Sequence, residues 1–133
     1  MKIRTLMEDN ISGENLCAEH GLCIYVETKK HKLLVDTGQS DRTWDNAKSK
    51  GINLKEIDTV VLSHGHYDHS GGLMSFAQIN PTAKIYMRTN AGGDYFSARS
   101  EMHYIGIDKR IEELPNLTLV DRDMEIDSEL SVF

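Results

Sequence analysis

The sequence predicts an α/β fold, with one mixed β-sheet and helices on one face of that sheet. The first observation is length, because 133 residues have the size of one domain and can bury a core. The second is that short runs rich in β-branched residues alternate with segments of helical period. The third is that no internal repeat or linker divides the chain. Residues 1–133 are therefore predicted to form a single domain.

The predicted strands are short apolar runs bounded by turn residues. The second and third are separated by Thr28-Lys-Lys-His31, which predicts a hairpin. In chain order the predicted strands are Lys2–Glu8, Gly21–Glu27, Lys32–Asp36, Asp58–Leu62, Ala83–Met87, Leu117–Val120 and Glu125–Val132.

Three segments have helical spacing and stop signals. Residues 41–50 repeat apolar positions and end before Gly51, a C-terminal cap, and Trp44 is expected to anchor this helix in the core. Residues 72–79 have an apolar face, with Ser70 as a candidate cap. Residues 108–114 end at Pro115, and residues 89–106 are predicted to be a long loop with one helical turn.

Composition limits the partners and the compartment. The formal charge of −6 argues against a nucleic-acid surface that neutralises phosphates. No stretch has membrane-spanning length, and the N-terminal residues lack the apolar core of a signal peptide. We therefore expect a cytoplasmic protein with no membrane partner. Cys17 and Cys23 are expected to be reduced, because nothing indicates secretion, and their spacing fits no common zinc knuckle.

Residues 62–72, LSHGHYDHSGG, place three histidines and an aspartate within six positions directly after a predicted buried strand. In extended backbone, positions i and i+2 point the same way, so His64 and His66 converge on one point. Asp68 and His69 follow on the return of the loop. Imidazoles and carboxylates are ligands that zinc, iron and manganese accept, so the segment predicts a metal site. The alternatives are a histidine-rich surface loop and a metal-free His/Asp pair.

The run from His64 to His69 resembles the HxHxDH signature of the metallo-β-lactamase superfamily, in which two sheets are sandwiched between helices. The segments AEHGLCIYVE, LLVDTGQS, IDTVVLSHGHYDHSGGL and NPTAKIYM resemble the branch that is similar to dihydropterin-methyl-ribofuranosylaminobenzene phosphate synthase. The resemblance covers nearly all of the chain but only the N-terminal half of the superfamily's domain. It implies a metallo-β-lactamase-like half-sandwich.

The resemblance also implies roles for particular residues. His64 and His66 would bind a first divalent metal, and Asp68 and His69 a second, with zinc expected and manganese or iron as alternatives. Asp68 would be the catalytic residue that orients the nucleophile or takes its proton. Asp36 would hold the ligand rings by hydrogen bonds, the alternative being a simple turn-forming aspartate.

The later metal ligands of the superfamily fall outside these 133 residues. A catalytic zinc normally has three protein ligands, and a single sheet leaves one apolar face uncovered. We therefore expect a partner that completes the fold, either a complementing C-terminal half or a second copy in a homodimer.

Four other residue groups are weighed for a place near the site. The branch resemblance places Glu19 and His20 at the site edge, where they could meet substrate, although a lone histidine such as His20 is more often structural. His103 lies in the predicted long loop and could overhang the site, whereas His31 is expected to be exposed in the hairpin turn. Arg88 and Arg99 could bind a substrate phosphate, but ordinary surface solvation is the preferred interpretation for both.

The predicted function is that of a metal-dependent hydrolase, in which a metal-activated water attacks a phosphoester or a carboxylic ester or amide of a small-molecule substrate. A non-catalytic metal-binding or assembly half-domain is the first alternative. The second is an activity like that of the synthase branch.

Overall fold

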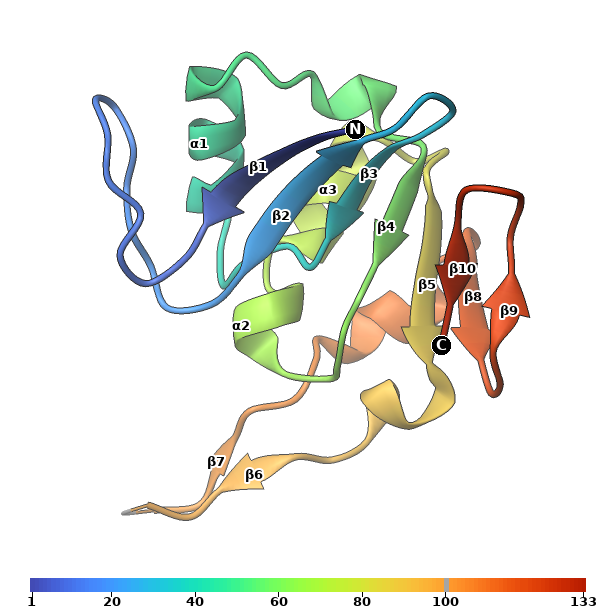
Figure 1. The fold of residues 1–133 in the computed structure, drawn as a ribbon. Coiled ribbons are helices and arrows are strands. Elements are labelled where there is room, and N and C mark those ends of the chain that lie inside the picture. The colour runs from blue at the N-terminus through green and yellow to red at the C-terminus, as the bar shows by residue number, and fades with distance from the viewer. Residues whose placement is uncertain (100) are drawn as a thin grey trace.

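The computed structural model describes residues 1–99 and 101–133, and its centre is a six-stranded mixed sheet (Figure 1). The strand order is β1-β2-β3-β4-β5-β8, with the first two pairings antiparallel and the last three parallel. The bounds are β1 Lys2–Met7, β2 Cys23–Glu27, β3 Lys32–Val35, β4 Thr59–Val61, β5 Lys84–Arg88 and β8 Leu117–Val120. The predicted α/β class with one mixed sheet is confirmed.

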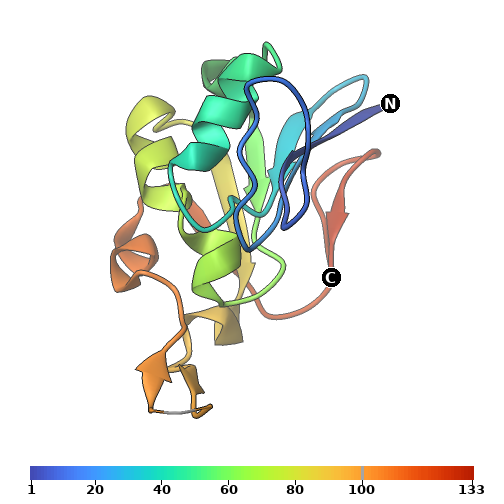
Figure 2. The same cartoon turned by 90° about the vertical axis from the view of Figure 1, so that its left-hand side faces the viewer.

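Parallel neighbours need long crossover connections, and these carry the helices. The helix α1 (Arg42–Ser49) and the 3₁₀ turn η1 (Leu54–Glu56) join β3 to β4. The helices α2 (Tyr67–Ser70) and α3 (Leu73–Ile79) join β4 to β5. Figure 2 shows the helices together on one side of the sheet, as the sequence predicts.

The connection from β5 to β8 is the longest. It contains the 3₁₀ turns η2 (Thr89–Gly92) and η3 (Lys109–Glu113) and a small antiparallel ribbon of β6 (Phe96–Ser97) and β7 (His103–Tyr104). The ribbon projects from the end of the sheet where β4 and β5 finish (Figure 1).

The core lies between the sheet and the helices. Leu34, Val60 and Ile85 point from adjacent strands into this layer and are completely buried. Trp44 of α1 packs on Phe76 of α3, with 5.7 Å between ring centroids, and its indole nitrogen donates to the Ser75 hydroxyl. Trp44 is therefore the core anchor that the helical spacing predicts.

The opposite face of the sheet is covered in part, and Leu33 of β3 and Thr59 of β4 on this face are buried. There a second small hairpin, β9 (Met124–Glu125) with β10 (Ser131–Val132), folds back over the sheet (Figure 2). Val132 packs there with Tyr86 and Val120, and all three are buried. At the other end, Ile3 of β1 remains 58% exposed. The sheet face is therefore open to solvent at Ile3.

Several local predictions are wrong. The segment 125–132 is not one strand, because it turns back on itself to form the β9–β10 hairpin. Ser70 does not cap α3, because it lies inside α2 and its hydroxyl donates to the carbonyl of His66. Residues 109–113 form a 3₁₀ rather than an α-helix.

His31 is also not exposed as expected. Its ring is 14% exposed and bridges two carboxylates, with Nδ1 at 2.8 Å from Asp58 and Nε2 at 3.1 Å from Asp127 of the β9–β10 turn. The C-terminal hairpin reaches the β2–β3 turn and buries this ring, which local sequence could not indicate.

Two further properties concern the whole chain. Both cysteines, Cys17 and Cys23, are free, as predicted. None of the helices in the described ranges is long and apolar enough to cross a membrane.

Candidate metal centre

The histidine-rich loop starts at the C-terminal end of β4, an inner strand of the sheet. Here the Leu62 amide still donates to the Tyr86 carbonyl of β5. His66 then has extended backbone and precedes the single-turn helix α2, in which the Ser70 amide donates to the His66 carbonyl. This strand–loop–helix junction places Asp68 and His69 on a tight turn that faces back toward His64.

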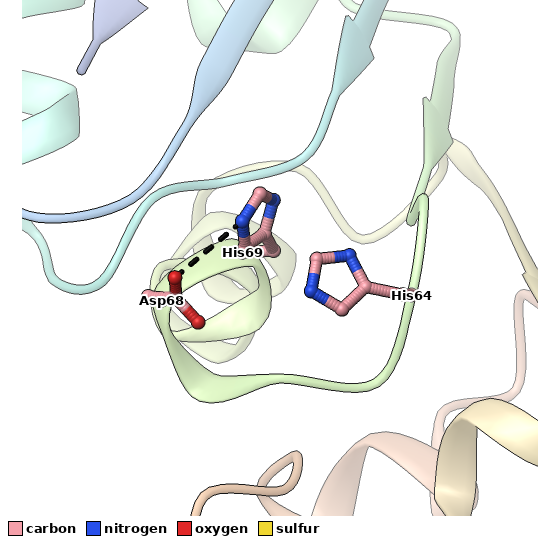
Figure 3. A group of neighbouring side chains, drawn as sticks. All are labelled: His64, Asp68 and His69. Carbon is pink, nitrogen blue, oxygen red and sulfur yellow. Dashed lines mark ion pairs between the residues drawn. The ribbon is translucent and has the colours of Figure 1, made fainter.

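Three predicted ligands come together. One side-chain donor atom from each of His64, Asp68 and His69 lies within 4.8 Å of the others (Figure 3). The Asp68 Oδ2 atom is 3.4 Å from Nε2 of His69. Two imidazoles and a carboxylate converging at this separation form a donor set that a divalent transition metal accepts.

His66, the fourth predicted ligand, lies beside this group without being part of it. Its ring centroid is 4.6 Å from that of His64 and 5.5 Å from that of Tyr95, both in edge-to-face arrangements. The sequence pairs His64 with His66 on one metal, whereas the described geometry places His64 closest to His69, at 4.1 Å between centroids.

Asp36 holds the ligands from behind. It is completely buried and has a left-handed backbone, with φ of 61°. Its carboxylate accepts hydrogen bonds from the Ser63 amide, the Ser63 hydroxyl and Nδ1 of His69, each at 2.7 Å. A carboxylate bonded to the far nitrogen of a histidine fixes the ring and its tautomer, so Nε2 of His69 is left to bind metal.

A hydrogen bond to the Nδ1 atom also orients the ring of His64. Its Nδ1 lies 2.9 Å from the Ser63 hydroxyl, which again leaves Nε2 available. Burial lowers the pKa of His64 below its ordinary value, and the neighbouring His69 and His66 add to this effect. The ring is therefore neutral near pH 7, which is the form that binds metal. The residues that surround the site thus fit a bound divalent ion.

The N-terminal loop before β2 lies against the candidate ligand Asp68. Nε2 of His20 is 3.4 Å from Asp68 Oδ2, while Nδ1 of His20 is 3.2 Å from Asp9. A side chain at Gly21 would meet the Asp68 carbonyl at 2.0 Å, so this close approach requires glycine. The loop is therefore seated directly on α2.

Other candidate residues lie at different distances from the ligands. Glu19 accepts a hydrogen bond from the Ser40 hydroxyl at 2.7 Å. His103 lies exposed in the β6–β7 ribbon, outside the ligand group.

Sequence reasoning did not find Ser63 or Asp9. The one signal for Ser63 in the sequence is its position directly before His64. Asp9 gave none, because its link to His20 spans eleven residues of irregular loop.

A mixed sheet with helices on one face, and a His/Asp ligand group at the end of a parallel strand, define the class. Residues 18–123 match the family model described as the Metallo-beta-lactamase superfamily, and the chain belongs to this superfamily. It is 32% identical over 136 residues to the 7,8-dihydropterin-6-methyl-4-(beta-D-ribofuranosyl)-aminobenzene-5'-phosphate synthase of Methanocaldococcus jannaschii, a match that covers 92% of this chain and 46% of the relative.

Two other matches agree. A second Methanocaldococcus jannaschii protein is 31% identical over 135 residues, which is 96% of this chain and 50% of the relative. The crystal structure of Tm1679, described as a metal-dependent hydrolase of the beta-lactamase superfamily, superimposes with a TM-score of 0.76 at 30% identity. The superposition covers 97% of this chain and 46% of the Tm1679 chain. The chain therefore spans about half the length of the curated relatives it matches.

Proposed function

We propose that this chain supplies half of a hydrolytic metal centre, with His64, His66, Asp68 and His69 binding divalent metal, for which zinc is the expected ion. The observation that carries the proposal is the ligand group within 4.8 Å, together with the bond from Asp36 to His69. A histidine-rich surface loop would not need a buried carboxylate behind its ring. The membership of the superfamily and the similarity to Tm1679 support the same class of chemistry.

A bound divalent metal would supply Lewis-acid activation of water and of the bond to be hydrolysed. The chain's own residues would orient and move protons around it. Oδ2 of Asp68 is already in contact with His20 and His69, at 3.4 Å from each. Oδ1 of Asp68 is therefore the atom proposed to accept the proton of the attacking water. The predicted substrate is a small molecule with a phosphoester, a carboxylic ester or an amide.

The proposal includes a partner that completes the site. The described residues bring three donors together, and a second ion would need more. The uncovered end of the sheet, where Ile3 is exposed, is where a second layer would pack. Because the chain spans half the length of its relatives, a complementing C-terminal half is the favoured partner, and a homodimer is the alternative.

Metal content tests the proposal. We expect purified, zinc-equilibrated protein to hold about one ion per chain after removal of loosely bound metal, measured by plasma mass spectrometry. His69→Gln is expected to lose most of this metal, because it removes a ligand that Asp36 orients. His103→Gln is the matched control, since this histidine is exposed and outside the group.

Hydrolysis is then assayed with aryl phosphate and aryl ester substrates. Activity that depends on metal and is lost in Asp68→Asn would support the catalytic proposal. Tight metal binding without hydrolysis, even with the complementing half present, would instead identify a non-catalytic metal-binding module. Equal metal content in the wild-type protein and His69→Gln would contradict the proposed centre.

A second candidate is an activity like that of the synthase branch, favoured by the 32% identity to the Methanocaldococcus jannaschii enzyme over most of this chain. It predicts that the completed protein consumes a phosphorylated ribosyl substrate together with a pterin. Product analysis by mass spectrometry, with both compounds supplied, separates this candidate from simple hydrolysis.

A further inference from the structure

A pocket of about 310 Å³ adjoins the metal ligands on the side toward β5. His64 and His66 form one wall, and Arg88, at the end of β5, and Tyr95 form the other. This volume is at the lower end of the range of small-molecule sites, so the pocket suits one chemical group of a substrate. Its shared wall with the ligands means that a group bound here lies next to the metal.

Arg88 lines this pocket, and one nitrogen of its guanidinium group lacks a hydrogen-bond partner among the described residues. This nitrogen, Nη1, is fully buried. A buried N–H group without an acceptor is costly, because the loss of its hydration is not compensated. Ordinary surface solvation, the interpretation preferred from sequence, does not account for this nitrogen of Arg88.

The lining of the pocket offers Arg88 no counter-charge. None of the described residues that line it is acidic, and Arg88 is its only lysine or arginine. This is notable in a chain with a formal charge of −6. Arg99 differs, because it lines a separate pocket that also contains the Asp68 carboxylate. The electropositive side of the metal centre is thus the Arg88 side.

The position of Arg88 relative to the ligands is rigid. Arg88 pairs with Val120 in the sheet, and the turn η2 follows it immediately. A side chain at Gly65 would meet the Ala91 carbonyl of η2 at 1.9 Å, so the ligand loop and η2 touch backbone to backbone. Such a site is preorganised, which lowers the cost of binding a group there.

We infer that Arg88 binds an oxyanion of the substrate, a phosphate or a carboxylate, in the pocket between β5 and the His64–His66 loop. The inference rests on the proposed function for the role of that oxyanion, since the metal would act on a bond next to the anchored group. The planar fork of a guanidinium matches two oxygens of a phosphate or carboxylate. The substrate is accordingly an anion rather than a neutral ester.

Titration of the metal-free chain with inorganic phosphate tests this inference independently of metal binding. By isothermal calorimetry we expect the wild-type protein to bind phosphate and Arg88→Gln to bind it roughly tenfold more weakly or worse, as expected for loss of a charge-assisted bidentate contact. Arg88→Lys is expected to fall in between, because it keeps the charge but loses the fork. Arg122→Gln removes the same charge from a side chain that is 85% exposed, and should bind like wild type.

A parallel titration with acetate distinguishes the two sources of the oxyanion. Binding of phosphate alone identifies a phosphate site, and binding of both identifies a general oxyanion site. If the wild-type protein binds neither, or if Arg88→Gln binds phosphate as tightly as Arg122→Gln, the inference is overturned. If metal content fails its test while phosphate binding depends on Arg88, the proposed function fails and the oxyanion site stands.

Thermal unfolding provides a second readout. Arg88→Met keeps the aliphatic stem but removes the buried nitrogen that lacks a described partner, so its unfolding midpoint should equal or exceed that of wild type. A purely structural arginine would give the opposite result, a clear decrease in the midpoint of Arg88→Met. Addition of phosphate should raise the midpoint of the wild-type protein and leave Arg88→Met unchanged.

Discussion

The two faces of the central sheet differ in how completely they are covered. The helix face buries Leu34, Val60 and Ile85 completely under α1 and α3, whereas the opposite face is covered only in part, by the β9–β10 hairpin (Figure 2). The candidate ligand group follows the C-terminal end of β4, an inner strand of the sheet. The difference shows that the helix face holds most of the buried core, whereas part of the opposite face stays exposed to solvent.

The largest effect is expected from breaking the helix face. Phe76→Ala removes a completely buried ring that packs on Trp44, and should lower the free energy of unfolding by about 3–5 kcal/mol. Ile79→Ala in the same helix is the control, because Ile79 is 40% exposed and should cost less than about 1 kcal/mol. Urea unfolding followed by circular dichroism measures both. Similar losses in the two variants would contradict the assignment of the core to this face.

The next largest effect is expected at Asp36, beside the candidate ligand group. Asp36→Asn replaces a buried carboxylate that accepts three hydrogen bonds, so about 1–3 kcal/mol of stability should be lost. Metal affinity should fall by roughly 10–100-fold, because His69 loses its orienting partner. Competition with a zinc chelator measures the affinity. Asp45→Asn, on the exposed side of α1, is the control, and an equal affinity in both variants would contradict the role of Asp36.

A smaller effect is expected at the covered end of the open face. Val132→Ala removes methyl groups from the cluster with Tyr86 and Val120, and should cost about 1–2 kcal/mol. Phe133→Ala changes a neighbour that is 88% exposed and should be neutral. If both variants unfold like the wild-type protein in urea, the hairpin does not contribute to the stability of the sheet.

The hairpin should also make stability depend on pH. The hydrogen bond to Asp58, with that to Asp127, raises the pKa of His31 above its ordinary value, although burial opposes this. The charged ring therefore stabilises the folded state fully below the ordinary histidine pKa of about 6.5, and this contribution is lost as pH rises through the raised value.

The two carboxylates set the acid limit of this window. Burial acts to raise the pKa of Asp58, but hydrogen bonds from Thr59, Lys32 and His31 outweigh it and the pKa is lowered. The hydrogen bond from the Glu129 amide lowers the pKa of Asp127, and the neighbouring His31 and Lys30 lower it further. Their contribution is lost as pH falls through these lowered values. His31→Gln should abolish the loss of stability at alkaline pH. If the free energy of unfolding of His31→Gln differs from that of wild type by a constant amount between about pH 5 and pH 9, the His31 contacts with Asp58 and Asp127 do not contribute as described.

The smallest effect on folding is expected at the uncovered end. Ile3→Ser should change the free energy of unfolding by less than about 0.5 kcal/mol, because Ile3 is 58% exposed. It should nevertheless weaken association with the complementing half or with a second copy, measured by sedimentation velocity. Leu119→Ser is the control, because Leu119 is similarly exposed, at 50%, but lies on the opposite face. Equal association of the two variants would contradict a docking role for the open face.

The sequence was sufficient for the parts that depend on local pattern. Short apolar runs bounded by turn residues predicted all six strands of the central sheet to within a few residues, because composition and turn signals are local properties of the chain. The spacing from His64 to His69 predicted a cluster of candidate ligands, and the structure brings His64, Asp68 and His69 together, since a strand end followed by a tight turn places such neighbours close to one another.

The single-turn helix α2 was missed for a local reason. Four residues between glycine-containing loops carry too little periodicity to distinguish a helical turn from a loop. The β9–β10 hairpin was read as one strand because its turn, around Asp127, lacks glycine and proline.

What only the tertiary structure decided are the contacts made across long stretches of chain. Asp36 meets His69 across 33 residues, and His31 meets Asp127 across 96. Nη1 of Arg88 lacks a hydrogen-bond partner among the described residues, and this too depends on which groups the fold places around β5. Sequence alone was enough to name the candidate ligands, because ligand type and spacing are local properties. Which groups support those candidates, and which polar atom beside them is buried without a partner, follow from packing and burial, which exist only once the sheet and its layers have assembled.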